Sequence, residues 1–365
     1  MLNTLTKKPQ NIVLVGDAFV SPDTMEAAVR SSKISIGKIS KAYWGTPDKS
    51  EFAERQLNIE RHGAEAEAWA DGLEQLMEDC TVLVTHFNPV PAALIEKAPN
   101  LKAILTCRGG LEHIDLNAAN NRGIPVVNVI RNAIPVAEFA LGLILSVTRN
   151  ISTSHHLLID GKWEKVYPNS EYTSTLSNMT VGLIGIGNIG IELAVRLKAL
   201  GVSLIAFDEY ISKERLERNG LADIKMVGSM EELFSTADII SLHLRLTPET
   251  EGIINKKYFD LMKPTAYFIN TSRGGLVNQA DLIDTLKNHR IAGAALDVFD
   301  KEPLPENSGF SGLDNVVITP HIAGATVDAI PMSPYLLMRE TDKIIEKGLT
   351  DRIVNFDKIK GVCLE

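Results

Sequence analysis

Short apolar runs alternate along the chain with longer segments in which apolar residues recur every three or four positions. In the first half, the apolar runs expected as strands are 12–17, 81–86, 101–107 and 125–130. Helical patterns, such as the one at 65–79, lie between them. This alternation predicts a parallel sheet with helices on both faces. The segment 40–62 is polar and has no clear period, so we expect an irregular surface excursion there.

The second half continues the alternation. Its expected strands are GLIGIG (182–187), SLIAFD (203–208), IISLHL (239–244), AYFINT (266–271), AGAALDVF (292–299) and NVVITP (315–320). The stretch 136–151 is apolar nearly all round, so we expect a helix that is buried on several sides, links two domains and meets another subunit. A last helix, from about 325 to 347, is expected to return to the first domain.

The pattern therefore predicts an α/β protein made of two doubly wound parallel-sheet domains with a cleft between them. One domain is expected to be discontinuous, formed by residues 1–146 and 320–365, and to bind the substrate. The other is expected to span residues 147–319 and to bind the cofactor. A chain of 365 residues is long enough for two domains with full cores.

Composition and charge narrow the possible partners. With 45% hydrophobic and 23% charged residues, the chain has the composition of an ordinary globular protein. A net charge of −9 gives no electrostatic reason to expect nucleic acid or an anionic membrane as a partner. The apolar tract 134–147 is too short to span a bilayer. Cys80, Cys107 and Cys363 form no metal or disulfide pattern, so we expect a cytoplasmic protein with no metal site.

A glycine motif begins the second domain. Gly185, Gly187 and Gly190 follow an apolar run and open a helical pattern, and a second apolar run ends at Asp208. This order of strand, glycine turn, helix, strand and acid is typical of a dinucleotide-binding Rossmann unit. Gly185 permits the tight turn, Gly187 lets the backbone approach a pyrophosphate, and Gly190 lets the helix pack on the strand. The helix N-terminus supplies free N–H groups for that pyrophosphate.

Asp208 bears on the choice of cofactor. It is placed to accept hydrogen bonds from a ribose diol, and its charge would repel a 2′-phosphate, so NAD is expected rather than NADP. The alternative is a strand-end carboxylate in solvent. A helix-capping role is less expected, because Ser212 is better placed to cap the next helix.

Three charged or titratable residues follow predicted strands of the second domain: Arg273, Glu302 and His321. Because parallel strands end at one edge of a sheet, we expect the three side chains to reach that edge together. An arginine can hold a substrate carboxylate, a histidine can exchange a hydroxyl proton near neutral pH, and an acid can fix the histidine tautomer. Taken singly, each could be a solvated turn or loop residue or a domain-boundary residue.

These motifs resemble the D-isomer-specific 2-hydroxyacid dehydrogenase family. The resemblance rests on GLIGIGNIG, SLHLRLTPET, FINTSRGGLV, ALDVFDKEPLP and VVITPHIAGAT, and it runs from about residue 80 to residue 330. It implies that Arg273, Glu302 and His321 are the catalytic arginine and the glutamate–histidine pair. It implies cofactor contacts at Gly185, Gly187, Asn188, Ile189, Gly190, Asp208, Thr271, Ser272, Asp297 and Gly324, with Asp297 holding the carboxamide. It also implies that the backbone N–H groups of Gly109 and Gly110 bind the substrate carboxylate.

The chain departs from the family at three arginines. Arg108 and Arg131 stand where glycine is common, and Arg245 replaces a usual proline. Arg108 suggests a second anionic or polyhydroxy feature on the substrate, and the alternative is that it pairs with Glu112. No permanent cation follows the strand ending at Thr85, and with 365 residues we expect no further regulatory domain. A phosphoglycerate substrate is therefore possible but not favoured.

The sequence thus predicts an NAD-dependent oxidoreductase that interconverts a D-2-hydroxy acid and its 2-oxo acid, and that forms a homodimer through the 136–151 region. One alternative is a phosphoglycerate dehydrogenase specifically. Another is an NAD-responsive interaction protein resembling co-repressors of this fold, with weak or no turnover. Formate dehydrogenases share the fold but pair their histidine with glutamine, so Glu302 argues against that activity.

Overall fold

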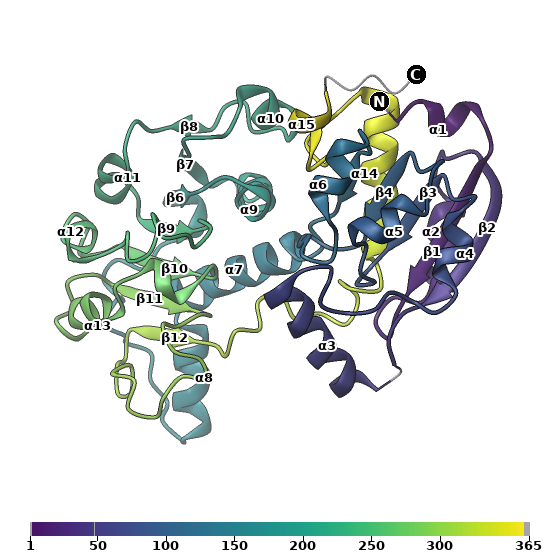
Figure 1. Cartoon of the computed structure of the whole chain (residues 1–365). Coiled ribbons are helices and arrows are strands. Elements are labelled where there is room, and N and C mark those ends of the chain that lie inside the picture. Colours follow the sequence, from purple (N-terminus) through teal and green to yellow (C-terminus); the bar gives the residue numbers. More distant parts are fainter. Residues whose placement is uncertain (1, 47, 361–365) are drawn as a thin grey trace. The chain divides into compact units, whose positions relative to one another are not determined.

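The structure of the protein is a computed structural model that describes residues 2–46 and 48–360. The chain forms two compact units (Figure 1). Unit 1 comprises the residues up to Arg131 and those from Thr326 onward, and unit 2 comprises Asn132–Ala325. From the sequence, we expect the boundaries between the two domains at 146/147 and 319/320. The helix at 133–148 belongs to unit 2, because it packs against two helices and three strands of that unit.

Unit 1 contains a five-stranded parallel sheet in the order β2-β1-β3-β4-β5. The strands are β1 (Gln10–Gly16), β2 (Ile36–Tyr43), β3 (Val82–Thr85), β4 (Ala103–Thr106) and β5 (Val126–Asn128). The helices are α1 (Thr4–Lys7), α2 (Pro22–Arg30), α3 (Lys49–His62), α4 (Leu73–Met77), α5 (Ala92–Glu96), α6 (Leu116–Asn121), α14 (Ser333–Lys347) and α15 (Phe356–Ile359). The order is the flavodoxin-like one, and the four strands expected from the sequence all form.

Alternate residues of the unit 1 strands face opposite cores. Ile12 and Leu14 of β1 pack with α2 and α14, whereas Val13 and Val15 pack with residues of α3, α4, α5 and α6. Both faces of the sheet are therefore covered, which explains why its central strands are continuous apolar runs. The final helix is part of unit 1 and packs against α2, but it begins at Ser333 rather than near 325.

The prediction of an irregular excursion at 40–62 was wrong. This stretch completes the edge strand β2 and contains the helix α3. The residues of β2 are half-buried or exposed and several are polar, so the sequence shows no apolar run there that would predict a strand. Phe52 and Ile59 of α3 are fully buried, seven residues apart on one face, among mostly polar positions. The helix expected at 65–79 shrinks to α4, because Gly72 adopts a left-handed conformation (φ 71°) immediately before it.

Unit 2 contains a seven-stranded parallel sheet in the order β12-β11-β10-β9-β6-β7-β8. Its strands are β6 (Thr180–Ile184), β7 (Ser203–Phe207), β8 (Lys225–Met226), β9 (Ile239–Leu242), β10 (Tyr267–Asn270), β11 (Gly293–Leu296) and β12 (Val316–Ile318). All six strands expected from the sequence form. β8 was not expected, because its two residues are exposed and too few to show a period. The strand order reverses between β9 and β6, which is where open α/β sheets bind ligands.

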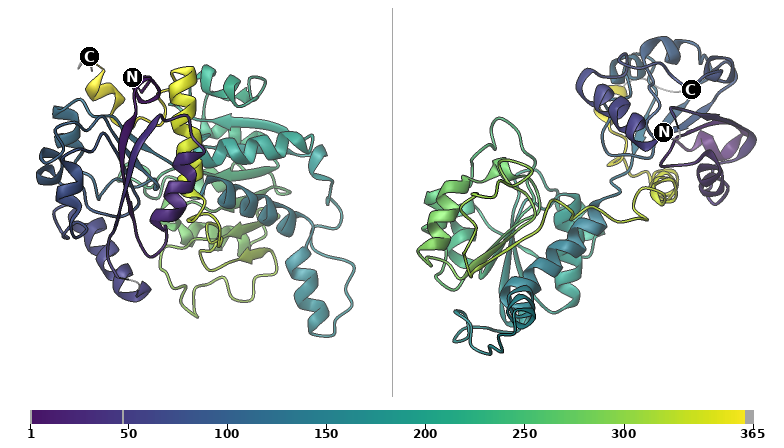
Figure 2. Two further views of the ribbon diagram at one scale, coloured as in Figure 1. Left: turned by 90° about the vertical axis from the view of Figure 1, so that its right-hand side faces the viewer. Right: turned by 90° about the horizontal axis from the view of Figure 1, so that it is seen from below.

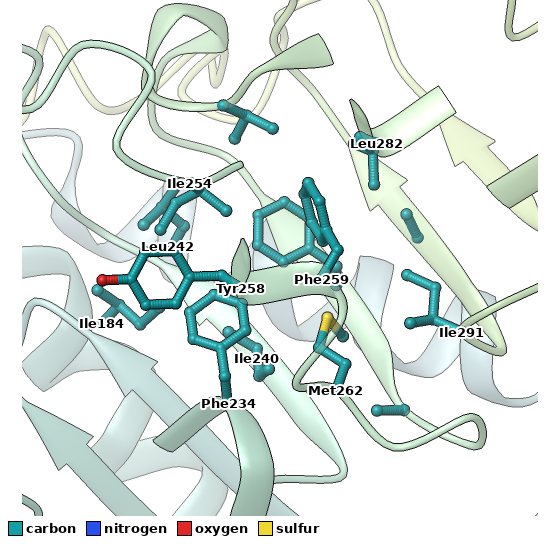
Figure 3. Packing of buried hydrophobic residues seen from close by; sticks show 14 of the residues in the cluster. Ile184, Phe234, Ile240, Leu242, Ile254, Tyr258, Phe259, Met262, Leu282 and Ile291 are labelled. Atoms are coloured by element: carbon teal, nitrogen blue, oxygen red, sulfur yellow. The ribbon is translucent and has the colours of Figure 1, made fainter. Parts of the chain in front are cut away.

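Helices cover both faces of the unit 2 sheet (Figure 2). They are α7 (Ala133–Thr148), α8 (Ile151–Ile159), α9 (Asn188–Ala199), α10 (Lys213–Arg218), α11 (Met230–Thr236), α12 (Lys256–Phe259) and α13 (Gln279–Lys287), with short 3₁₀ turns at Leu176–Asn178 and Gly274–Leu276. Figure 3 shows the core under α11, α12 and α13. There the Phe234 and Tyr258 rings are 4.9 Å apart, and Phe259 meets Phe268 edge-on at 5.4 Å. Such aromatic packing fixes the sheet that carries the site.

The apolar helix expected at 136–151 is α7 followed by the start of α8. Val136, Ala140 and Ile144 of α7 are buried against unit 2, whereas α8 buries none of its residues. Within the described part of the chain, no single helix is long and apolar enough to cross a membrane. The pair α7–α8 meets that test by length and composition together, with a bend of 64° between the two helices.

Two of the three cysteines lie in unit 1 as buried free thiols. Burial raises the pKa of Cys80 to about 12, and it also raises the pKa of Cys107. A thiol with a raised pKa is a poor nucleophile, so these two cysteines are core residues. Cys363 lies outside the described residues.

Candidate active site

The glycine turn between β6 and α9 has little free space except at its middle glycine. Gly185 has φ 84°, and a Cβ there would fall 2.8 Å from the carbonyl oxygen of His243. A Cβ on Gly190 would fall 2.5 Å from the oxygen of Gly185, which explains the close packing of α9 on the turn. At Gly187 an added Cβ would have no neighbour within 4 Å. Gly187 is thus open at the N-terminus of α9, as the approach of a pyrophosphate requires.

Asp208, directly after β7, is tied to the glycine turn. Its Oδ2 accepts a hydrogen bond from the N–H of Ile186 (2.8 Å), and its Oδ1 accepts from the N–H groups of Tyr210 (2.8 Å) and Ile211 (3.0 Å). The carboxylate is therefore half-buried and ordered rather than free in solvent. Helix capping is left to Ser212, whose hydroxyl accepts from the N–H of Arg215, as expected.

Arg215 reaches the glycine turn, which its distance along the sequence did not indicate. Its guanidinium donates to Oδ1 of Asn188, the first residue of α9, at 2.9 Å. The end of α10 thus brings a cation beside the helix N-terminus that would hold a pyrophosphate.

Arg273 lies in a loop that is fixed at its base. The Ser272 hydroxyl donates to the carbonyl of Leu242 (2.6 Å), so the loop after β10 is bonded to the end of β9. Asn270 accepts from the N–H of Ser272 (2.9 Å) and donates to the carbonyl of Arg273 (3.0 Å). A Cβ on Gly274 would fall 1.9 Å from the backbone of Phe299, so two loop backbones touch there. Arg273 itself is exposed to solvent, although the loop residues around it are held rigidly.

Sequence reasoning gave Asn270 no role. The signal was present, because Asn270 is a polar residue that ends a buried strand and is itself only 1% exposed. Buried polar side chains of this kind are normally hydrogen-bonded, and here the bonds shape the loop that presents Arg273.

Glu302 and His321 form a hydrogen-bonded pair. Oε2 of Glu302 accepts from Nδ1 of His321 at 2.6 Å, and Oε1 accepts from the N–H of Phe299 at 3.0 Å. Partial desolvation pushes the pKa of Glu302 up. The hydrogen bonds from His321 and Phe299 and the charges of His321 and Arg273 outweigh it, so the pKa of Glu302 lies below its usual value. Glu302 is therefore an anion at neutral pH, beside both a histidine and an arginine.

Asp297 holds the loop that carries His321. It is fully buried, and its carboxylate accepts hydrogen bonds from the Thr319 hydroxyl (2.6 Å), the N–H of Ile322 (3.0 Å) and the N–H of Ala323 (2.8 Å). These bonds bracket His321, which has a left-handed backbone (φ 54°). The carboxamide contact implied by the family resemblance would have to share a carboxylate that already accepts three hydrogen bonds.

A pocket of about 750 Å³ joins these elements. Its lining includes Ile189, Thr271, Ser272, Arg273, Asp297, His321 and Gly324. The Thr271 hydroxyl in this lining is buried and has no hydrogen-bond partner among the described residues, and neither has Nδ1 of His243. Burial lowers the pKa of His243 to about 4, so that imidazole is neutral. A polar ligand would satisfy these two atoms, and the open Gly187 leaves room for its phosphates, so the residues fit a bound dinucleotide.

A second pocket, of about 610 Å³, borders the Glu302–His321 pair. Phe299, Pro303 and Leu304 line it together with Glu302 and His321. His321 thus borders both pockets, and most of the expected catalytic and cofactor residues come together in unit 2.

The expected substrate residues Arg108, Gly109 and Gly110 lie in unit 1, in the loop after β4. Arg108 makes ion pairs with Glu60 (3.0 Å) and with Glu112 (3.4 Å). The pairing with Glu112, which was the alternative to a binding role, is therefore present.

Comparison with known proteins agrees with this geometry. The family model described as D-isomer specific 2-hydroxyacid dehydrogenase, NAD binding domain, matches residues 141–323. A glyoxylate reductase from Thermofilum pendens is 36% identical over 311 residues, which cover 82% of this chain and 90% of that protein. A D-3-phosphoglycerate dehydrogenase from Archaeoglobus fulgidus is 39% identical over 282 residues, which cover 76% of this chain but only 52% of that protein. The chain thus spans about half the length of that relative.

A solved structure shows the same fold. The D-isomer specific 2-hydroxyacid dehydrogenase from Lactobacillus delbrueckii ssp. bulgaricus, in its NAD-complexed form, superposes with a TM-score of 0.65 at 24% identity, covering 94% of this chain and all of that one. The chain belongs to the D-isomer specific 2-hydroxyacid dehydrogenase family, whose members are NAD-dependent oxidoreductases acting on CH–OH groups.

Proposed function

We propose that the protein interconverts a small D-2-hydroxy acid and its 2-oxo acid through Arg273, Glu302 and His321. The observation that supports this most directly is the 2.6 Å hydrogen bond between Glu302 and His321, within the electrostatic reach of Arg273 and beside the pocket that fits a dinucleotide. NAD supplies the hydride transfer at the substrate C2 carbon. The protein supplies orientation, charge and a proton.

Each of the three residues has a distinct task in this proposal. The guanidinium of Arg273 binds the substrate carboxylate and polarises the C2 oxygen. Nδ1–H of His321 is engaged by Glu302, so Nε2 exchanges the proton with that oxygen. The Glu302 charge stabilises the protonated imidazole and fixes its tautomer. Asp297 acts through the loop, because its hydrogen bonds hold the backbone on either side of His321.

The remaining contacts follow the expectations from the sequence. The proposed cofactor residues are Gly185, Gly187, Asn188, Ile189, Gly190, Asp208, Thr271, Ser272, Asp297 and Gly324. Asp208 selects NAD through the ribose diol and through repulsion of a 2′-phosphate. The backbone N–H groups of Gly109 and Gly110 bind the substrate carboxylate, and Arg108 contributes to substrate selection.

Two alternatives stay open. A phosphoglycerate substrate is supported by the relatives of that name, although they are about twice as long as the matched segment. An NAD-responsive interaction protein would keep the same three residues, so the geometry alone does not separate it from an enzyme. Initial rates of NADH oxidation with pyruvate, hydroxypyruvate, glyoxylate and 3-phosphohydroxypyruvate test both. Absence of turnover with every 2-oxo acid would contradict the enzymatic proposal.

We also propose a cytoplasmic homodimer with no nucleic-acid or membrane partner. The apolar surface that supports a second copy lies mainly on α8 and the segment after it rather than on α7. Ile159 is 72% exposed, Trp163 75% and Val166 78%. An apolar surface of this kind is typical of an interface between subunits.

A further inference from the structure

Four charged or titratable residues stand at the carboxyl edge of the unit 1 sheet. Asp17 follows β1, His86 follows β3, Arg108 follows β4 and Arg131 follows β5. These strands are neighbours, and the strand order reverses between β1 and β3. Ligands of open parallel sheets bind at this edge, next to such a reversal. In the proposed function, the main substrate contacts at this edge are the backbone N–H groups of Gly109 and Gly110.

Three of these residues form a continuous hydrogen-bonded chain. Nδ1 of the fully buried His86 lies 2.7 Å from Oδ2 of Asp17, and the Arg131 guanidinium donates to Nε2 of His86 at 2.7 Å. Since one ring nitrogen donates and the other accepts, the imidazole is neutral, and burial lowers the pKa of His86 in keeping with this. The other oxygen of Asp17 accepts from the N–H groups of Phe19 and Val20, so the chain has a rigid base.

This arrangement positions Arg131 without neutralising it. Its hydrogen-bond partner is a neutral imidazole, and among residues 2–46 and 48–360 no carboxylate lies within 4 Å of its guanidinium. Burial and the charge of Arg108 lower the pKa of Arg131, and the charges of Asp17 and Glu60 offset this only from a distance, so a directly bound anion would stabilise this half-buried cation.

Arg108 supplies a second cation with an unpaired donor. Its side chain is 9% exposed and lies over the Phe87 ring, with the guanidinium carbon 3.5 Å from the ring centroid. NH2 is paired with Glu60 and Glu112, whose side chains are 43% and 41% exposed, whereas NH1 is buried without a partner. The two glutamates approach one nitrogen from solvent and leave the other for an acceptor that the described chain does not contain.

We propose that Arg108 and Arg131 recognise a second acidic group, a carboxylate or a phosphate, on the substrate, so that the substrate is a doubly acidic 2-oxo acid. This inference rests on the proposed function. Glu60 and Glu112 occupy NH2 of Arg108, and their negative charges oppose the binding of the ligand's acidic group at the neighbouring NH1. The hydrogen bonds that link Asp17, His86 and Arg131 position the guanidinium and leave its positive charge available for the ligand.

Steady-state kinetics on the full chain give the first test. The substrates are pyruvate, oxaloacetate, 2-oxoglutarate and 3-phosphohydroxypyruvate, and the quantity compared is kcat/KM for each doubly acidic substrate divided by kcat/KM for pyruvate. This ratio should fall about ten- to a hundredfold in Arg131→Gln and in Arg108→Gln, the usual worth of a hydrogen bond to a charged group. Arg131→Lys should restore part of it. Arg30→Gln, which removes an exposed arginine of α2, is the matched control and should leave the ratio unchanged.

Glu112→Gln tests the effect of the glutamate charges in the opposite direction. Removing the carboxylate that pairs with Arg108 should lower KM for the doubly acidic substrates, whereas loss of a merely structural ion pair would lower stability and leave the ratio as it was. This variant also answers the objection that an arginine variant folds poorly. Comparing oxaloacetate with 3-phosphohydroxypyruvate distinguishes a carboxylate from a phosphate.

Calorimetric titration separates this inference from the proposed function, because it needs no turnover. D-malate and 3-phosphoglycerate should bind the full chain more tightly than D-lactate does, and Arg131→Gln should abolish the difference. If pyruvate is reduced but the ratio is the same in all variants, the anion site is refuted and the enzyme proposal stands. If no 2-oxo acid is reduced, the titration alone decides, and equal affinity for D-malate and D-lactate refutes the site.

Discussion

Nδ1 of His321 lies 2.6 Å from Oε2 of Glu302, while the second oxygen of the carboxylate is held by the backbone N–H of Phe299. The carboxylate therefore cannot rotate away from the imidazole without breaking a second hydrogen bond. This fixes which ring nitrogen carries a proton toward Glu302 and which is left to serve a substrate. The pair comes from two different strand-end loops, after β11 and after β12.

Replacing His321 by alanine tests the proton transfer directly. His321→Ala should lower kcat roughly 10²–10⁴-fold, the usual contribution of a positioned acid–base group. NADH affinity, measured by fluorescence titration, should change little, because the dinucleotide is expected to contact the glycine turn and the loop after β10. A loss of NADH binding equal to the loss of rate would place His321 in the cofactor site instead.

Glu302→Gln should shift the pH dependence of 2-oxo acid reduction to lower pH. Reduction needs the protonated imidazole, and the negative charge of Glu302 favours that form. The pKa of Glu302 lies below its usual value, so this charge is present throughout the neutral range. Without this charge, the proton donor loses an electrostatic stabilisation, so the alkaline fall in rate should begin at lower pH. A profile of kcat against pH that is identical in the variant and the unmodified protein would remove the pair from the mechanism.

The central strands and the candidate site residues stand out in the sequence because both are local signals. Buried parallel strands are continuous apolar runs, and Arg273 and His321 directly follow such runs at β10 and β12. The edge of unit 1 was missed for the opposite reason. β2 has water on its outer side and therefore lacks an apolar run, and α3 shows its buried face only at Phe52 and Ile59.

Partners that come from distant segments could not be predicted from sequence. Arg131 and His86 are 45 positions apart, and neither lies in a motif. Arg215 reaches Asn188 only because α10 folds back beside the N-terminus of α9. Spacing rules describe neighbours within one helix or one turn, whereas these contacts depend on which strands lie side by side.

Cofactor choice should depend on Asp208. In the double variant Asp208→Asn with Glu209→Arg, the ratio of kcat/KM with NADPH to that with NADH should rise about tenfold or more, because repulsion is replaced by a phosphate partner. Asparagine is preferable to alanine, since it keeps an oxygen that can accept from the backbone of Tyr210 and Ile211. Glu209→Arg alone is the control. An unmodified protein that already prefers NADPH would show that the role assigned to Asp208 is wrong.

The apolar surface after α7 should hold two copies together. Light scattering at micromolar concentration should give about twice the chain mass of 39.9 kDa. Ile159→Asp should shift the population toward monomer, because it buries a charge in the proposed interface. Val327→Asp, at a valine that is 97% exposed in unit 1, is a matched control and should leave the mass unchanged. A monomer in the unmodified protein would contradict the dimer.

Asp297 should matter for both stability and rate, through the loop that it anchors. Asp297→Asn replaces an acceptor oxygen by an N–H₂ group facing backbone donors, so one of the hydrogen bonds to Thr319, Ile322 and Ala323 is lost. The free energy of unfolding, from urea titration, should fall by about 1–3 kcal/mol. Asp223→Asn, at an exposed surface aspartate, should lower the free energy of unfolding far less.

Because Asp297 acts by positioning His321, the losses of kcat in Asp297→Asn and His321→Ala should not add in the double variant. Fully additive losses would show that Asp297 affects the rate independently of His321, which would contradict the positioning role.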